Sequence, residues 1–536
     1  MTGRPRRLAA STLFLLVITA HAHASDWYVN KVSGSDSNSG SQANDAWRTI
    51  THASAALASS LGPQTIHLAA GTYSPANGEL FPIVLRDDQR IVGDAGARLT
   101  FIEAAGPTGT AFRLTAATSV NPNGLSSGTM LVGMTLRNWS IGVSIETGNQ
   151  PCDPTLRGLA FLNCAQGVLV NVGSATGTGT ASASPRIEHS YFEGNVRGVS
   201  VTSPLQVTGP AAGVIHLLDS TMYGNVVAVR MLVVGRESAL EVDRTNIFDC
   251  TVGPAIEMYA GNYTAGTGPS DGHLTVRDSV LAENAEGAIF AQGGGSPLGI
   301  SCVVRGCTIT RNYGYGVRKV LGSLEVSNSI VWNNLGEIQS NDAQVIVRAS
   351  DVGDGGYLGQ LGTIQEDPLF ANAPQRDFRL RFGSPCVDHG DPAFTSTVDS
   401  VGAERTIDGD LDRIGRPDMG AIELQTLRLG GPTQIGRELV LELSGSDGLT
   451  SRLFMARAGA VAAAATPFGD FRLPFDQAIQ LADLPVAEYP PYTLRRAIPN
   501  NPVLIGKTFS FQALTHSFES PTGAAYTNPV SFVILP

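Results

Sequence analysis

Hydrophobic and polar positions repeat in a fixed order through the central part of the chain, from about Leu131 to Gln339. A small or turn-favouring residue is followed five positions later by Asn, and Gly with a β-branched residue usually comes three to five positions after that. The copies are Gly133…Asn138…Gly142-Val143, Gly158…Asn163…Gly167-Val168, Ser190…Asn195…Gly198-Val199, Ser220…Asn225…Ala228-Val229, Arg244…Asp249…Gly253, Ser279…Asn284…Gly287, Cys307…Asn312…Gly316-Val317 and Ser329…Asn334. Internal similarity of this kind is typical of a solenoid.

The residue types between the repeated positions favour strands over helices. The repeats are rich in Val, Ile, Thr and Gly, and short runs such as Leu240-Glu241-Val242 alternate apolar and polar residues. Strands of successive turns in such a coil pair at about 4.8 Å, so that equivalent side chains stack in columns. The pattern therefore predicts a parallel β-helix in which each copy is one turn.

Two columns follow from this register. The Asn column is expected at a turn, where amide side chains satisfy backbone groups and tolerate left-handed conformations. The residues three positions before the key Asn are expected to form one inward apolar column; they include Phe192, Met222, Leu281, Ile309 and Val331.

The flanking segments define four parts of the chain. Residues 1–24 combine arginines, a short apolar run and Ala22-His23-Ala24, the pattern of a secretory signal peptide. Residues 25–125 are expected to hold an N-terminal cap with a short alanine-rich helix and the first turns, because a terminal repeat must be covered. The coil with a closing segment is expected over 126–424, and alternating strands over 425–536 predict a β-sandwich.

Two segments resemble known families. Tyr28-Val29, the loop from Gly34 to Gly40, Trp47-Arg48-Thr49-Ile50, Ala70-Gly71-Thr72-Tyr73 and Gly93-Asp94 are similar to the DUF1565 family, which begins right-handed parallel β-helices of the pectate-lyase-like superfamily. Asp367-Pro368-Leu369-Phe370, the run from Gly383 to Asp391 and the run from Gly415 to Glu423 resemble the terminal segment of secreted bacterial β-helix proteins. These resemblances imply a right-handed coil and an all-β fold, and they imply function only weakly.

The net charge limits the classes of partner that the protein can bind, and the cysteine content bears on disulfide bonds. The formal net charge is −11, and loss of the arginine-bearing leader would make it more negative, which disfavours nucleic acid. No segment is long and apolar enough to predict a membrane span, and the sequence does not indicate an oligomeric state. Six cysteines in an exported chain permit disulfides, so one or two structural bridges are expected.

The repeat register also predicts a candidate site. The position six residues before each key Asn holds, on successive turns, Arg157, His189, Asp219, Asp243, Asp278, Gly306 and Asn328. If they stack, the carboxylates of Asp219, Asp243 and Asp278 are candidate catalytic groups, with Arg157, His189 and Asn328 as candidate substrate-binding residues. The alternative is that Asp and Asn simply favour this turn.

A second candidate lies in the run Asp408-Gly409-Asp410-Leu411-Asp412. The alternating carboxylates of Asp408, Asp410 and Asp412 resemble part of a Ca²⁺ loop, although the distal Glu of the full loop is missing. A calcium ion is therefore the one cofactor that the sequence suggests.

Two functions are expected, the first implied mainly by the resemblance to β-helix proteins of the pectate-lyase-like superfamily and supported in the sequence by the acidic column. The first is an exported protein that recognises extracellular or cell-surface polysaccharide along the coil, as a binding protein or as a polysaccharide lyase or glycoside hydrolase. The second is a non-catalytic cell-envelope or adhesion protein in which the coil is a rigid scaffold. Depolymerisation of glycans, and its loss in alanine variants of the three aspartates, distinguishes them.

Overall fold

A computed structural model describes residues 25–60, 62–116, 121–148, 150–172, 181–202, 211–234, 238–261, 272–293, 299–341, 344–518 and 520–536. The predicted signal peptide lies outside these residues. Among them, no helix has the length and apolar character needed to cross a membrane.

The N-terminal cap closes the first edge of the coil. Helix α1 (Ile50–Ala56) begins after Thr49, whose hydroxyl oxygen accepts a hydrogen bond from the backbone N–H of His52 at 3.0 Å. Trp27 stacks on Trp47, with ring centroids 5.1 Å apart. The short alanine-rich helix predicted from the sequence is therefore present, and it covers strands that would otherwise be open to pairing.

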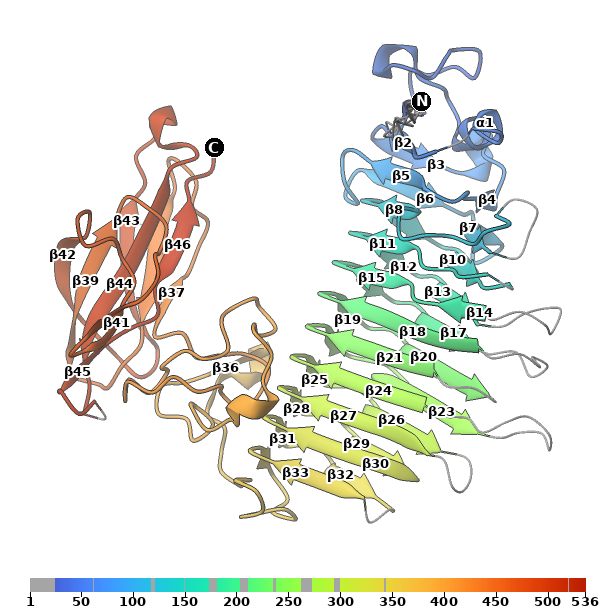
Figure 1. The fold of residues 1–536 in the computed structure, drawn as a ribbon. Coiled ribbons are helices and arrows are strands. Elements are labelled where there is room, and N and C mark those ends of the chain that lie inside the picture. Colours follow the sequence, from blue (N-terminus) through green and yellow to red (C-terminus); the bar gives the residue numbers. More distant parts are fainter. Residues whose placement is uncertain are drawn as a thin grey trace, which may run out of the picture.

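Three long parallel sheets build the coil (Figure 1). In order, the first sheet contains β1 (Ser25–Val29), β2 (Gln64–Leu68), β5 (Gln89–Gly93), β8 (Met130–Val132), β11 (Thr155–Arg157), β15 (Arg186–Glu188), β18 (Ala211–Leu218), β21 (Ser238–Asp243), β24 (Gly272–Arg277), β27 (Ile300–Arg305), β30 (Gly322–Ser327) and β33 (Val345–Arg348), with β14 (Ala181–Ala183) beside β18. The second contains β4 (Ile83–Val84), β7 (Thr110–Thr115), β10 (Ile141–Glu146), β13 (Gln166–Asn171), β17 (Arg197–Thr202), β20 (Val227–Val234), β23 (Ile256–Gly261), β26 (Gly287–Gly293), β29 (Tyr315–Val320) and β32 (Gly336–Ser340). The third contains β3 (Gly71–Tyr73), β6 (Thr100–Glu103), β9 (Thr135–Arg137), β12 (Ala160–Leu162), β16 (Tyr191–Glu193), β19 (Thr221–Tyr223), β22 (Asn246–Phe248), β25 (Val280–Ala282), β28 (Thr308–Thr310), β31 (Ile330–Trp332) and β34 (Asp351–Val352).

The middle residues of the third-sheet strands form the predicted inward column. They pair in register from turn to turn and are fully buried; they are Leu136, Phe161, Phe192, Met222, Ile247, Leu281, Ile309 and Val331. Because each turn buries one apolar residue at the same height, stacking turns produces a continuous core. The prediction of a right-handed parallel β-helix with an N-terminal helical cap and a C-terminal β-sandwich is confirmed.

Two ladders of polar side chains stabilise the turns on either side of the third sheet. In the first, each Asn carboxamide oxygen accepts a hydrogen bond from a backbone N–H of the preceding turn, as Asn225 does from Asn195 at 3.0 Å. This ladder comprises Asn195, Asn225, Asn284, Asn312 and Asn334. The second ladder uses hydroxyl oxygens in the same way and comprises Ser190, Ser220, Thr245, Ser279, Ser329 and Ser350. Buried backbone donors are thus satisfied at both turns.

The predicted Asn column is confirmed for five copies and shifted in the others. Asn138, Asn163 and Asp249 lie one residue before the ladder, at the turn position with positive φ angles of 64°, 55° and 55°. Gly194 and Gly224 occupy that same position on the turns between them. Asn, Asp and Gly all tolerate the left-handed conformation, so a one-residue shift leaves a similar sequence pattern.

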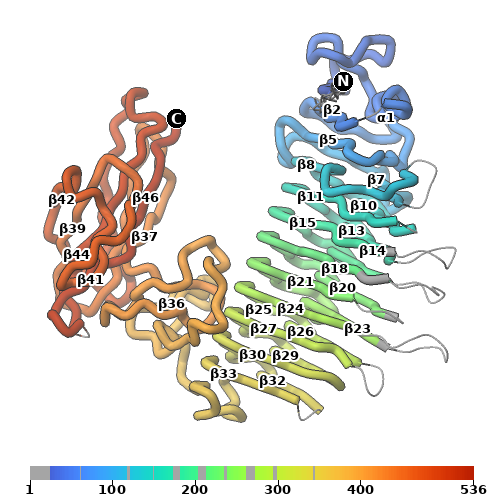
Figure 2. The backbone as a smooth tube through the Cα atoms, in the orientation of Figure 1, coloured from blue at the N-terminus to red at the C-terminus, as the bar shows by residue number. Residues whose placement is uncertain are grey.

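After the last turn the chain reverses direction. The closing segment contains the hairpin β35 (Phe370–Asn372) and β36 (Asp377–Leu380), and its Phe378 and Ala421 pack on Val280 and Ala282 of the third sheet. The C-terminal domain then stands beside the coil and does not continue its axis (Figures 1 and 2).

The C-terminal domain consists of antiparallel sheets around a separate core that includes Leu441, Leu453 and Phe511. One sheet contains β37 (Leu427–Leu429), β38 (Glu438–Leu443) and β43 (Tyr492–Ala497). The other contains β42 (Ile479–Pro485), β39 (Thr450–Ala456), β44 (Thr508–His516), β45 (Ala524–Tyr526) and β46 (Val530–Val533), and β40 (Ala464–Thr466) pairs with β41 (Gly469–Phe471).

The expectation of disulfide bridges is wrong. All six cysteines are free and buried: Cys152, Cys164, Cys250, Cys302, Cys307 and Cys386. They fill apolar positions of the coil and the closing segment as small hydrophobic residues do.

Candidate functional site

The predicted acidic column is not a column of three carboxylates. The left-handed turn position after each first-sheet strand holds Gly158, His189, Asp219, Arg244, Asp278, Gly306 and Asn328. Asp243 is therefore the last residue of strand β21, in register with Leu218 and Arg277. The register derived from the sequence was one residue off on this turn, because Arg244 was aligned with Ser220 while Thr245 continues the hydroxyl ladder.

Arginines separate and neutralise these carboxylates. Arg244 donates two hydrogen bonds to Asp219, at 2.6 Å and 3.0 Å, and this pairing lowers the pKa of Asp219. Arg277 contacts Asp243 at 2.7 Å. Each carboxylate thus carries its own cation, and the like-charge cluster that would trap a metal or share a proton does not form.

Asp278 belongs to a buried network that joins the coil to the closing segment. Its carboxylate accepts hydrogen bonds from Arg405 at 2.6 Å and from the hydroxyl of Ser396. Arg405 also pairs with Glu423 at 2.7 Å, and the side chains of Arg405, Asp278 and Glu423 are at most 3% exposed. Burial raises the pKa of Asp278, while Arg405 opposes the shift. A carboxylate enclosed in this way has a structural role, because it connects the coil to the closing segment.

The candidate substrate-binding residues lie apart from one another. Arg157 ends strand β11 and lies 3.5 Å from Glu188. His189 is exposed at the next turn, and Asn328 is buried, where its amide exchanges hydrogen bonds with the backbone of Asp391. The structure therefore brings none of these three together with another in one site, and the roles proposed for them and for the three aspartates stay predictions.

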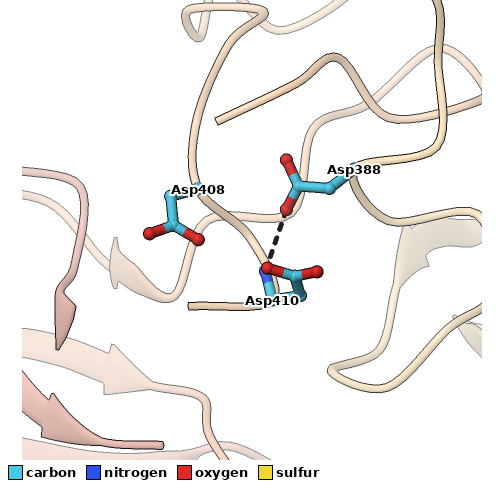
Figure 3. A group of neighbouring side chains, drawn as sticks. All are labelled: Asp388, Asp408 and Asp410. Atoms are coloured by element: carbon cyan, nitrogen blue, oxygen red, sulfur yellow. Dashed lines mark hydrogen bonds between the residues drawn. The ribbon is translucent and has the colours of Figure 1, made fainter. Parts of the chain in front are cut away.

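A group of three carboxylates is present in the closing segment (Figure 3). Ligand atoms of Asp388, Asp408 and Asp410 lie within 4.8 Å of one another. The backbone N–H groups of Gly409 and Asp410 donate to Asp388, at 2.7 Å and 3.0 Å, and so fix the loop around it. Oxygen ligands of this kind suit Ca²⁺.

The electrostatics of this group favour a cation. Burial raises the pKa of Asp388 to about 6, and burial with the charges of Asp388 and Asp410 raises that of Asp408 to about 7. One oxygen of Asp408 is buried without a hydrogen-bond partner in the described part of the chain. Of the sequence-predicted set, Asp408 and Asp410 are brought together, whereas Asp412 is not part of the group and instead accepts a hydrogen bond from the backbone of Ile414 at 2.6 Å.

A second feature was missed at the sequence level: two adjacent cavities where the coil, the closing segment and the C-terminal domain meet. The cavities have volumes of about 600 Å³ and 310 Å³, and Ala371, Arg381 and Tyr489 line both. We call their combined surface the junction groove. Trp332 of β31 lies at its coil end and Pro491 at its C-terminal-domain end.

The junction groove combines aromatic faces with a few polar groups. Trp332 and Phe370 are partly buried, and Tyr489 is 42% exposed. Arg311 and Asn333, from the turns after β28 and β31, add polar groups at the coil end. A pocket of this size and lining is typical of binding sites for small molecules or for short stretches of polymer. No sequence motif marks it, because its residues come from three separate parts of the chain.

Of the comparisons with known proteins, the family match concerns the first part of the coil. Residues 32–242 match the family model described as a protein of unknown function, DUF1565, so the match runs from the N-terminal cap to strand β21. No curated protein matches the chain. The crystal structure of the enzymatically active domain of tailspike protein 2 from bacteriophage CBA120 aligns over 88% of this chain and 69% of its own, at 11% identity and a TM-score of 0.14.

That alignment is too weak to carry an argument about site or substrate. The family match and the three stacked parallel sheets are independent of it. Together they show a right-handed parallel β-helix whose first part, residues 32–242, is similar to the DUF1565 family.

Proposed function

We propose that the protein is exported and binds extracellular or cell-surface polysaccharide, with the junction groove as its binding site. The observation that supports this most is the set of aromatic side chains, Trp332, Phe370 and Tyr489, along one groove. Sugar rings have apolar faces that stack on aromatic side chains, while their hydroxyl groups bond to nearby polar groups. The groove offers both kinds of surface.

The position of the groove suits a long ligand. Both cavities are open, and they share a wall at Arg381 and Tyr489, so a chain molecule can lie across both. Trp332 stands on the coil and Tyr489 on the C-terminal domain. A ligand bound here would contact both the coil and the C-terminal domain. A protein that served only as a rigid spacer, with contacts at one end, would not need a site shared by both parts.

A retention assay tests the proposal. The purified protein is passed over immobilised neutral and acidic polysaccharides, and affinities for retained glycans are measured by calorimetry. We expect Trp332→Ala and Tyr489→Ala each to weaken binding about tenfold or more, because aromatic anchors supply a large share of such binding energy. Tyr313→Ala is the control, since Tyr313 is 71% exposed and lines neither cavity.

Two outcomes would count against the proposal. Retention of no glycan would favour the scaffold function, in which the coil is a rigid spacer of the cell envelope. Equal effects of Tyr313→Ala and Tyr489→Ala would place the binding surface elsewhere on the molecule.

Cleavage is a separate question, and the carboxylates proposed for it are Asp219, Asp243 and Asp278. Depolymerisation of the retained glycans, assayed with and without Ca²⁺, tests for it. Loss of activity in the alanine variants without loss of folding would support a catalytic role. The ion pairs of these residues with Arg244, Arg277 and Arg405 favour instead variants that change stability.

A further inference from the structure

Arginines surround the junction groove, and most of them are already neutralised. Arg379 contacts Asp377, and Arg428 contacts Glu442. At the coil end, Arg311 lies 3.0 Å from Glu283. These guanidinium groups are engaged in ion pairs within the protein and have little free charge to offer a ligand.

Arg381 is the exception among the arginines that line the groove. It forms no ion pair with any carboxylate of the described residues, and its Nε–H has no acceptor there. One terminal nitrogen donates to the backbone oxygen of Ala371 at 3.2 Å. The guanidinium carbon lies over the ring of Tyr489, 4.2 Å from its centroid, in a cation–π contact that restrains the group.

The position of Arg381 makes its charge available to a ligand. It lines both cavities and therefore marks the point where they meet. A fixed, planar guanidinium that lacks a carboxylate is a ready partner for an anionic oxygen group. Its orientation is set before a ligand arrives, so little conformational freedom is lost on binding.

Carboxylates lie on either side of this cation. Asp367 lines only the cavity next to the coil, and Glu488 lines only the cavity next to the C-terminal domain; both residues are exposed. The groove thus has one unneutralised positive position between two negative ones. A ligand with an acidic group on every sugar would place charges beside Asp367 and Glu488, where like charges repel.

We infer that the junction groove selects an acidic polysaccharide whose charged sugars are separated by uncharged ones, with the acidic group bound at Arg381. This inference rests on the proposed glycan-binding function and adds the charge pattern of the ligand. The acidic group is a carboxylate or a sulfate, because a guanidinium binds either. Neighbouring sugars stack on Trp332 and Tyr489 and carry no charge.

A panel of defined polysaccharides tests the inference. It contains neutral glucans, an alternating polymer of glucuronate and N-acetylglucosamine, an alternating galactan with one sulfate per disaccharide, and a homopolymer of galacturonate. We expect the tightest binding among the alternating acidic polymers, and the carboxylate and sulfate members distinguish the two sources of charge. Reducing the glucuronate carboxyl groups to alcohols should weaken binding of that polymer at least tenfold.

Substitutions of charged residues in the groove test the same inference from the side of the protein. Arg381→Gln should weaken binding of the preferred acidic polymer at least tenfold and leave any binding of neutral glucan within threefold. Glu488→Gln should raise affinity for the galacturonate homopolymer severalfold, because it removes one repulsive charge. Arg452→Gln is the control, since Arg452 pairs with Asp483 on the C-terminal domain and lines neither cavity.

The possible results separate this inference from the function on which it rests. Tightest binding to neutral glucan or to the homopolymer, or less than a threefold effect of Arg381→Gln, overturns the charge pattern, while dependence on Trp332 and Tyr489 still supports glycan binding. Retention of no polysaccharide overturns both. Circular dichroism and an unchanged unfolding midpoint for Arg381→Gln ensure that a loss of binding is not a loss of folding.

Discussion

Arg405 is the residue on which the connection between coil and closing segment depends most. It bridges Asp278 of the coil and Glu423 of the closing segment, and it also donates to the backbone oxygens of Gly306 and Gly420. All of these groups are buried, so their charges and dipoles are compensated only by one another. A buried pair that loses one partner leaves an uncompensated charge.

Arg405→Ala should therefore destabilise the protein by about 3–5 kcal/mol. Urea unfolding followed by circular dichroism measures the change. Arg452→Ala serves as the comparison, because the Arg452–Asp483 pair is at least half exposed on both sides and should contribute less than about 1 kcal/mol. Similar effects of the two substitutions would show that the buried network does not join the two segments.

Asp351 makes stability depend on pH near the end of the coil. Burial raises the pKa of its carboxyl to about 7, and the thiol of Cys386 lies 3.4 Å away. In the unfolded chain the pKa would be about 4. The folded state thus holds the proton more tightly, and this contribution to stability is complete below about pH 4 and is lost as the pH rises through about 7.

Asp351→Asn should remove that dependence. Between pH 5 and pH 8 the wild type should lose stability relative to the variant, by an amount on the order of 2 kcal/mol. Urea midpoints measured at both pH values give the difference. A difference in unfolding free energy between wild type and variant that stays constant from pH 5 to pH 8 would mean that Asp351 is ionised throughout this range.

At the scale of the elements, the coil was largely predictable because its residues repeat. The inward column of Phe192, Met222 and Leu281 was visible from spacing alone, and it is present. The exact register could not be read from the sequence wherever Gly or Asn fills the left-handed turn. Gly158, for example, resembles Ser190 in the sequence pattern, but it occupies the left-handed turn, one position before the hydroxyl ladder to which Ser190 belongs. A similar one-residue shift at Arg244, which lies one position before Thr245 of the hydroxyl ladder, moved Asp243 out of the predicted acidic column.

The closing segment should respond to calcium. Binding of Ca²⁺ among Asp388, Asp408 and Asp410 would remove their mutual repulsion, so millimolar Ca²⁺ should raise the midpoint of thermal unfolding at pH 8 by several degrees. Asp388→Asn should abolish most of this rise, whereas Asp412→Asn should leave it intact. Scanning calorimetry with EDTA or Ca²⁺ measures it, and an unchanged midpoint in the wild type would argue that this group binds no calcium.

At the scale of the whole molecule, the junction groove is the feature that the sequence did not reveal. Trp332, Arg381 and Tyr489 belong to the coil, the closing segment and the C-terminal domain, and nothing in their spacing indicates that they meet. Their proximity depends on the reversal of the chain after the last turn. Periodicity predicts contacts between neighbouring turns, but it does not predict how a later domain folds back.

The coil and the C-terminal domain have separate cores, so they should unfold in distinct steps. Scanning calorimetry should show more than one transition. Leu240→Ala in the coil and Leu441→Ala in the C-terminal domain each remove a fully buried side chain at a cost of about 2–5 kcal/mol. Each should shift a different transition, and a common shift in both variants would show that the two parts unfold as one cooperative unit.

The six buried cysteines give this molecule a set of internal reporters. Burial raises the pKa of each thiol well above its usual range, so a folded turn presents no reactive thiolate to an alkylating reagent. Because five of them occupy different places along the coil and the sixth lies in the closing segment, the order in which they become labelled would trace where the cylinder first comes apart.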